Sequence, residues 1–220
     1  MVALLSYNKN PNIGVLARAN DSIALIPVEA SEMFSSTIEE ALEVEVYRTN
    51  ISGTILVGTM VAMNNNGIAL PRHVYENEIK VIKNSGLNYA ILEDKLTALG
   101  NLILLNDYCA IVSKEFSKKS IKTMEDVFGC EVEKSPVKEF RNIGSVGIAT
   151  NKGALLHPSL KEEELKKIEE LLRVEVDIGT VNRGIGFVRT GIIANNKNVV
   201  VGDLTTGVEI VRIEDTLLGR

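Results

Sequence analysis

The stretch Gly58–Pro71, GTMVAMNNNGIALP, decides the fold. Two apolar segments flank a polar centre made of Asn64, Asn65, Asn66 and Gly67. Asn and Gly tolerate the positive φ angles that a tight hairpin turn requires. The stretch therefore predicts a β-hairpin.

The same pattern recurs along the chain. The other copies are Gly14–Pro27, Gly100–Ser113, Gly144–Pro158 and, more loosely, Gly186–Gly202. The first glycines of successive copies are 44, 42, 44 and 42 residues apart. The turn asparagines keep a similar spacing at Asn20, Asn64, Asn106, Asn151 and Asn195. A fixed period of this length is typical of repeat, propeller or solenoid architectures.

Helical patterns follow the first four hairpins. Apolar residues fall on one helical face in segments 31–42, 72–86, 114–128 and 159–173. Ser31 and Ser159 are the expected N-caps of the first and fourth of these helices. The fifth unit carries no such pattern, and Asp203–Gly207 is expected to replace its helix with a loop.

Short strands with alternating apolar and polar residues are predicted after the helices, at 44–47, 130–133 and 174–177. Similar patterns occur near the two ends of the chain, at 2–7 and 208–213. We expect one of these two terminal segments to complete a blade and close the ring.

The predicted fold class is α/β, with five ββαβ units of about 44 residues, the last one truncated. One such unit cannot bury its apolar face alone, so a single domain over 1–220 is expected. We place the units at roughly 9–52, 53–95, 96–139, 140–181 and 182–220. A five-bladed α/β propeller fits best, with hairpins at the centre, helices on the rim and the first glycines in a ring on one face. Four-stranded β-propellers lack such helices, leucine-rich repeats have a shorter period, and armadillo repeats lack strands.

Composition narrows the class of function. The chain has 220 residues and a formal net charge of −5, which argues against broad phosphate binding and favours a basic protein partner. The first residues do not resemble a signal peptide, and no apolar run is long enough to span a bilayer. A cytoplasmic protein without a membrane partner is expected.

The sequence offers no catalytic constellation. His73 and His157 have no partner at metal-ligand spacing, and Cys109 and Cys130 fall in strand patterns that indicate burial. Neither a dinucleotide-binding nor a P-loop motif is complete. We therefore expect no catalytic residue, no metal site and no cofactor.

Several motifs in combination resemble the translation initiation factor 6 family in its archaeal form. They are Leu99-Gly100-Asn101 followed by Asn106-Asp107-Tyr108, and the segments Gly179–Gly184, Asn12–Gly14, Gly67–Pro71 and Gly153–Pro158. The resemblance extends from about Tyr7 to Leu217. It implies the pentein five-bladed α/β propeller, which agrees with the repeat pattern, and a ribosome anti-association factor without enzymatic activity.

The resemblance also implies a partner and a surface. Members of the family bind the intersubunit face of the large ribosomal subunit, touching ribosomal proteins uL14 and eL24 near the sarcin–ricin loop, and so block subunit joining. The resemblance extends the expectation to a role in large-subunit maturation. A monomer is expected. Carried over by position, the ribosome-facing residues are Gly14, Gly58, Thr59, Asn64, Gly100, Asn101, Gly144, Ser145, Ile185 and Gly186.

Two departures bear on this expectation. Thr59 stands where eukaryotic relatives carry an Arg, so a charged contact is not implied there. The sequence ends at Arg220 without the longer phosphorylatable tail of some eukaryotic members, so control through such a tail is not expected.

The alternative is a pentein enzyme that modifies guanidino groups with a Cys nucleophile, but both cysteines lie in the third unit rather than near the chain end.

Overall fold

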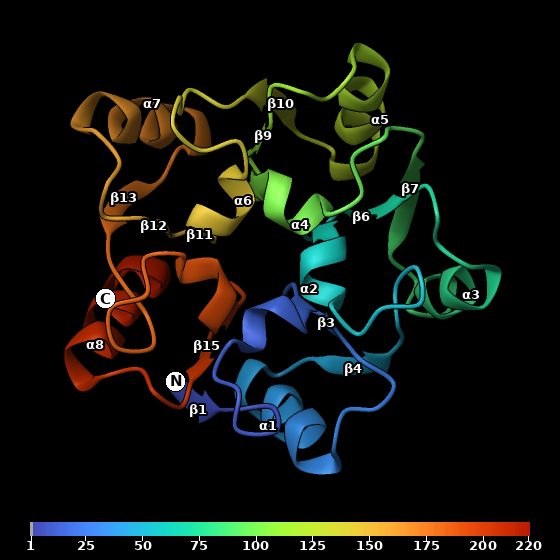
Figure 1. Ribbon diagram of the computed structural model, residues 1–220, viewed down its shortest axis with the longest axis horizontal. Helices are drawn as coiled ribbons and strands as arrows, with labels where there is room; N and C mark the ends of the chain where they lie inside the picture. Colours follow the sequence, from blue (N-terminus) through green and yellow to red (C-terminus); the bar gives the residue numbers. More distant parts are fainter. Residues whose placement is uncertain (1) are drawn as a thin grey trace.

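All five hairpins are present, and their sheets stand in a ring around a central axis in the computed structural model, which describes residues 2–220 (Figure 1). The two strands of each hairpin are antiparallel. A third strand pairs in parallel with the second strand of each hairpin. The α/β five-bladed fold is confirmed.

Each sheet has an inner, a middle and an outer strand. The inner strands are β2 (Arg18–Ala19), β5 (Ala62–Met63), β8 (Ile103–Leu105), β11 (Gly147–Ala149) and β14 (Ile192–Ala194). The middle strands are β3 (Ile23–Ile26), β6 (Gly67–Pro71), β9 (Cys109–Val112), β12 (Gly153–Leu156) and β15 (Val199–Gly202). The outer strands are β4 (Glu45–Arg48), β7 (Asn88–Leu92), β10 (Glu131–Lys134), β13 (Glu175–Ile178) and β1 (Val2–Leu5). Every residue of the middle strands is buried, which explains their continuous apolar sequence.

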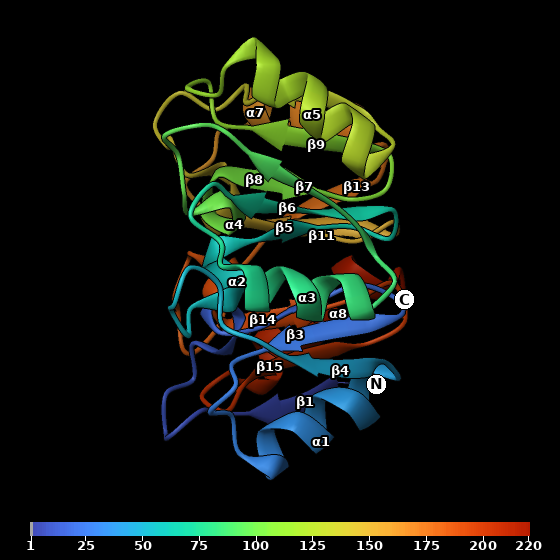
Figure 2. The same cartoon turned by 90° about the vertical axis from the view of Figure 1, so that its right-hand side faces the viewer.

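Long helices cover the rim and short helical turns precede the inner strands (Figure 2). The long helices are α1 (Glu32–Leu42), α3 (Glu76–Asn84), α5 (Lys118–Phe128), α7 (Glu162–Leu172) and α8 (Gly207–Leu218). The helical turns are η1 (Ile13–Val15), α2 (Val57–Met60), α4 (Leu99–Leu102), α6 (Ile143–Val146) and η2 (Val188–Gly191). The first glycines of the first four units therefore lie in helical turns, not at strand starts as the repeat pattern suggested.

The predicted caps have different outcomes. Ser31 caps α1, because its side chain accepts a hydrogen bond from the Phe34 amide. The assignment of Ser159 is wrong, since α7 begins after Lys161. The Ser159 hydroxyl lies instead 2.8 Å from Nδ1 of His157.

The N-terminal strand closes the ring. β1 pairs in parallel with β15 and completes the fifth blade, as the sequence predicted for one of the terminal segments. The strand predicted at 208–213 is wrong, because this segment belongs to α8. Its apolar residues also have helical spacing: Ile213 and Leu217 lie on the buried face. Thr206 and Glu209 form the capping box that starts the helix, so the fifth unit is not truncated.

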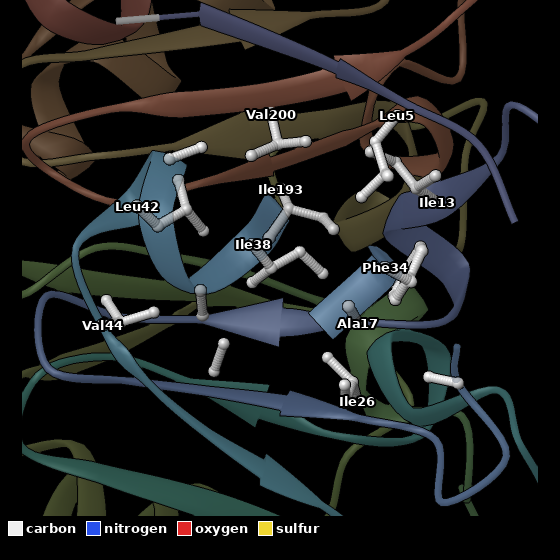
Figure 3. Close-up of a cluster of buried hydrophobic side chains, with 14 residues drawn as sticks. Leu5, Ile13, Ala17, Ile26, Phe34, Ile38, Leu42, Val44, Ile193 and Val200 are labelled. Carbon is white, nitrogen blue, oxygen red and sulfur yellow. The ribbon is translucent and has the colours of Figure 1, made fainter. Parts of the chain in front are cut away.

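Five apolar clusters fill the spaces between neighbouring blades. In the cluster of Figure 3, Ile38 and Leu42 of α1 lie against Ile193 and Val200 of the fifth blade. The other long helices repeat this arrangement against the blade that precedes them, with Ile82, Met124, Ile168 and Ile213. No blade has a core of its own, so each unit depends on its neighbours.

The glycines of the helical turns allow these neighbours to approach closely. A Cβ atom on Gly58 would lie 2.2 Å from the carbonyl oxygen of Gly14. One on Gly100 would lie 2.1 Å from that of Gly58, and one on Gly144 would lie 2.3 Å from that of Gly100. These distances are shorter than any real Cβ contact, so the close approach of the backbones requires glycine.

Carboxylates tie the long helices to the loops beside them. In α3, Glu78 accepts hydrogen bonds from the amides of Ser52 and Gly53 at 2.7 and 2.9 Å. Glu209 of α8 accepts from the Gly184 amide at 2.9 Å and from the Thr180 hydroxyl at 2.7 Å. Each of these carboxylates also accepts a hydrogen bond from the amide of its own N-cap residue, so one side chain both starts a helix and holds a loop.

We expect Gly58→Ala to lower the free energy of unfolding by about 3 kcal/mol or more, because a backbone carbonyl cannot move away from the added methyl group. Chemical denaturation followed by circular dichroism would measure the loss. Gly207→Ala is the matched control: a Cβ atom there meets nothing within 4 Å, and the change should stay within about 0.5 kcal/mol. Equal effects of the two substitutions would show that the ring of glycines is not tightly packed.

The pH dependence of stability should report on Glu209. Desolvation raises its pKa, but the hydrogen bonds from Thr206, Thr180 and Gly184 outweigh this effect and lower the pKa from 4.5 to about 2. The carboxylate therefore stabilises the fold above about pH 4.5, and this contribution is lost as the pH falls towards 2. After allowance for solvent screening, Glu209→Gln should cost about 1–2 kcal/mol at pH 7.

Urea titrations between pH 2 and 7 would test this expectation. The acid-induced loss of stability should be smaller in Glu209→Gln than in the unmodified protein. Glu162→Gln is the control, since Glu162 forms an exposed ion pair with Lys166 that should contribute little. An unchanged acid profile in Glu209→Gln would mean that the capping hydrogen bonds do not depend on the charge.

Candidate docking surface

The two ends of the axis are built from different elements. Helical turns such as α2 and α4 stand at one end, and the hairpin turns lie at the other (Figure 2). The residues predicted to face a partner are divided between these ends. We call the end with the helical turns the docking end and describe it first.

The predicted glycines come together at the docking end but are not exposed. Gly14, Gly58, Gly100 and Gly144 are all buried. Their close approach to neighbouring carbonyl groups assigns them to the packed interior of the ring. They therefore support the surface loops around them, and they do not form a flat exposed face of small residues.

Two predicted polar residues lie beside this ring. Thr59 is half-buried on α2, and its hydroxyl donates to the Val15 carbonyl of the neighbouring unit at 3.4 Å. Asn101 is half-buried on α4. Ser145 differs, because it is buried on α6 and donates to the Asn142 carbonyl at 2.9 Å. Thr59 and Asn101 can meet a partner, whereas Ser145 mainly shapes its own turn.

The position predicted for the fifth glycine is wrong. A Cβ atom on Gly14 would lie 2.1 Å from the carbonyl oxygen of Arg189, so Arg189 holds the fifth place in the ring. Gly186 instead lies against the side chain of His157, whose Nε2 would be 2.5 Å from a Cβ atom there. In the fifth unit the glycine lies three residues before the ring position, which Arg189 holds.

Exposed apolar side chains lie beside the ring in the second and fifth units. Ile185 was predicted and is exposed, and Phe187, Ile55 and Leu56 join it although sequence reasoning missed them. Phe187 packs edge-on against Phe140 and His157, with ring centroids 6.0 and 5.2 Å away. Burial lowers the pKa of His157, which favours its neutral form in this cluster. The missed residues directly precede the helical turns of their units, and that position was the available signal.

The loops that carry these apolar residues are fixed in place. We call 51–56 and 181–187 the docking loops. Their tight turns have positive φ at Ser52, Asn182 and Arg183, and each loop closes with a short backbone bridge. The carboxylates of Glu78 and Glu209 accept hydrogen bonds from amides of these turns. The apolar side chains are therefore presented on an ordered surface, which lowers the entropy cost of binding.

Asn64 lies at the opposite end of the axis. It is buried, and its side chain donates to the carbonyls of Asn106 and Phe128 at 3.3 and 2.9 Å. Its Oδ1 accepts from the amides of Asn66 and Gly67, which fixes its own hairpin turn. The carried-over role for Asn64 is therefore difficult to reconcile with its position, because a buried side chain that links two blades cannot also meet a partner.

The other turn residues repeat this pattern. Asn106 donates to Thr150 and Leu172, and Asn195 donates to Asn20 and Leu42. In the fourth unit the equivalent residue is Thr150, whose hydroxyl donates to the Leu217 carbonyl at 2.7 Å. The predicted Asn151 is thus one residue out of step with the buried turn positions.

Asn151 belongs to a second ring at the mouth of the axis. Its members are Asp21, Asn65, Asp107, Asn151 and Asn196. Each backbone amide donates to a side-chain oxygen of the next member at 2.6–3.0 Å, and the last bond runs from Asn196 back to Asp21. Asn side-chain amides also donate to the two carboxylates, so the ring is a closed circuit of hydrogen bonds.

A channel of about 40 Å³ follows the axis behind this ring. It is lined by both rings of turn residues, by inner-strand residues and by Arg18 and Arg189. Within residues 2–220, the residues that line it include neither a cysteine nor a histidine. The channel therefore lacks the side chains of a thiol-based active site.

Neither cysteine has the lowered pKa of an activated thiol. Cys109 is buried in β9, and desolvation, with a smaller effect of Cys130, raises its pKa to about 12. Desolvation, followed by the charge of Asp107, raises the pKa of Cys130 to about 11. A nucleophilic cysteine needs a lowered pKa, so neither thiol suits that role.

The fold is similar to that of enzymes with distant sequences. A DDAH from Pseudomonas aeruginosa in complex with citrulline matches with a TM-score of 0.51 and 16% identity, over 79% of this chain and 71% of that one. A cyanobacterial arginine dihydrolase matches with a TM-score of 0.54 and 12% identity, over 91% of this chain and 36% of that one. At this identity the likeness shows the shared fold alone.

The relatives that match this chain over nearly their whole length are translation factors and not enzymes by name. Translation initiation factor 6 from Pyrococcus abyssi is 40% identical, over 97% of this chain and 96% of its own. The protein of that name from Staphylothermus marinus is 38% identical, over 99% and 98%. In the described part of the chain, no helix is both long and apolar enough to cross a membrane. The eIF-6 family model matches residues 2–216, so the chain belongs to the eIF-6 family.

Proposed function

We propose that this chain is a non-catalytic translation factor that binds the large ribosomal subunit at its intersubunit face and prevents association with the small subunit. The observation that carries the proposal is the ordered apolar surface of the docking loops in a chain of this family. Exposed side chains such as Leu56, Ile185 and Phe187 cost free energy in water, and a partner that covers them recovers it. A role in large-subunit maturation would use the same surface.

The charge of the chain supports a basic partner. With a formal net charge of −5, it complements basic ribosomal proteins better than rRNA. Among basic ribosomal proteins we propose uL14 and eL24, the partners that the family resemblance implies, with the sarcin–ricin loop nearby. A cytoplasmic monomer suffices for this role, because a factor that covers the intersubunit face can block subunit joining by steric exclusion alone.

We expect Leu56→Glu to weaken binding to the large subunit at least tenfold. Leu56 is 40% exposed at the start of α2, and a carboxylate there would have to be desolvated without a partner. Co-sedimentation with purified large subunits gives the affinity, and sucrose gradients with added small subunits give the anti-association activity. Thermal unfolding should be nearly unchanged.

Tyr108→Glu is the matched control. Tyr108 is 42% exposed in the hairpin turn between β8 and β9, at the end of the axis opposite the docking end, and it receives the same change to a carboxylate. It should bind the large subunit like the unmodified protein. Equal affinities of the two variants would exclude the docking loops as the binding surface.

The alternative is a guanidino-modifying enzyme, and its support is the fold shared with two such enzymes. The raised pKa values of Cys109 and Cys130 argue against it, because they keep both thiols protonated at neutral pH. The relatives with high identity are named as translation factors. We therefore propose that the chain has no enzymatic activity.

Cys109→Ala should retain full binding to the large subunit and lose about 1 kcal/mol of stability, because the smaller side chain leaves a small cavity between the third and fourth blades. Co-sedimentation and urea denaturation would measure the two quantities. A Cys109→Ala protein that folds but no longer binds the large subunit would favour the enzyme hypothesis instead.

A further inference from the structure

Two arginines line the axial channel. Arg18 comes from β2 of the first unit and Arg189 from η2 of the fifth. They are only 8% and 4% exposed. The positions equivalent to Arg18 in the other inner strands hold Ala62, Leu104, Ile148 and Ile193. The two buried cations are thus departures from the repeat, and both lie where its first and last units meet.

Their guanidinium groups are poorly satisfied by the protein. Arg18 donates from Nη2 to the Met63 carbonyl at 3.4 Å, and Arg189 donates from Nη1 to the Ile192 carbonyl at 3.5 Å. Both bonds are long for a charged donor. Nε of Arg18, and Nε and Nη2 of Arg189, are buried without any hydrogen-bond partner in the described chain. Neither arginine forms an ion pair within residues 2–220.

The carboxylates of the channel are already engaged. Asp21 accepts from the backbone amide of Asn196 and from the side-chain amides of Asn65 and Asn196, at 2.6–2.8 Å. Asp107 is held in the same way by amides of Asn65 and Asn151. These bonds fix both acids in the ring at the channel mouth, so they do not neutralise the arginines behind them.

Leaving two cations buried together is unfavourable. Desolvation lowers the pKa of Arg18 to about 10, and desolvation with the charge of Arg18 lowers that of Arg189 further below its usual value. Arg18 remains protonated at neutral pH. A buried charge needs a counter-charge or strong hydrogen bonds, because water no longer solvates it. The N–H groups without partners therefore require a negatively charged hydrogen-bond acceptor.

We propose that the axial channel binds a small inorganic anion, of the size of chloride, between Arg18 and Arg189. A volume of about 40 Å³ holds a halide or a few water molecules, but no nucleotide or sugar phosphate. Arg18 belongs to the first unit and reaches a carbonyl of the second, and Arg189 belongs to the fifth. The anion would therefore link the first and fifth units around the axis.

Anomalous diffraction from crystals grown with sodium bromide tests the site directly. The expected result is a bromide peak within contact distance of the Arg18 and Arg189 side chains. Density for water alone, without an anomalous peak at high bromide concentration, would overturn the proposal and leave an ordinary hydrated channel.

Stability in solution provides the second test. At constant ionic strength, replacing gluconate, which is too large for the channel, with chloride or bromide should raise the Tm. At a halide concentration ten times the Kd, the rise should be roughly 3–5 °C. Arg189→Met should abolish this dependence, whereas Arg72→Met, at an exposed site, should retain it.

The diffraction test and the stability test are independent of each other. If Arg189→Met does not fold, Arg18→Met takes its place, and the bromide experiment needs no variant. The same halide dependence in the unmodified protein and in a folded Arg189→Met variant would assign the effect to the surface and contradict the proposal. Neither test involves the ribosome, so their failure would leave the docking surface untouched.

Discussion

The hydrogen bonds that the buried turn side chains make between blades are the interaction on which the rest of the structure depends. Asn64 shows what one such side chain does: its oxygen fixes its own hairpin, and its nitrogen holds the next turn and the end of α5. Buried amides are costly unless every polar atom finds a partner, so this geometry strongly specifies how neighbouring blades meet. At the opposite end of the axis, the packing of glycine against carbonyl groups allows no other spacing. With both ends fixed, the helices must pack between blades.

Much of this arrangement could be predicted from the sequence, because it repeats. The period, the hairpins, four of the rim helices and the N-terminal strand all follow from residues whose turn chemistry or apolar spacing recurs. The first four ring glycines were identified for the same reason, although their role is close packing and not exposure. The apolar docking residues Ile55, Leu56 and Phe187 could not be found in this way, since exposure depends on how the loops fold around the ring.

The errors concentrate in the fourth and fifth units, where the repeat is weakest. In the fourth unit the hydroxyl of Thr150 makes the interblade hydrogen bond that an asparagine amide makes in the other units. The sequence pattern pointed instead to the neighbouring Asn151. Arg189 stands where the other units have glycine, and Gly186 was chosen in its place. The segment 208–213 fits both a strand and a helix by spacing, and only the capping box of Thr206 and Glu209 distinguishes them. A pattern shared by five units is robust to one substitution, but identifying the substituted position requires the structure.

Departures from a repeat are informative about function because the common positions are already explained by packing. In this chain they fall into two groups. One comprises Arg18 and Arg189 on the axis, which come from the neighbouring first and fifth units. The other comprises the docking loops of the second and fifth units, whose apolar side chains have no counterpart in the buried framework. Both groups rest on the same framework of turn amides and glycines, which holds the docking loops in a fixed relation. For the binding proposed above, this rigidity would limit the conformational entropy lost when the docking loops meet a large, preformed partner.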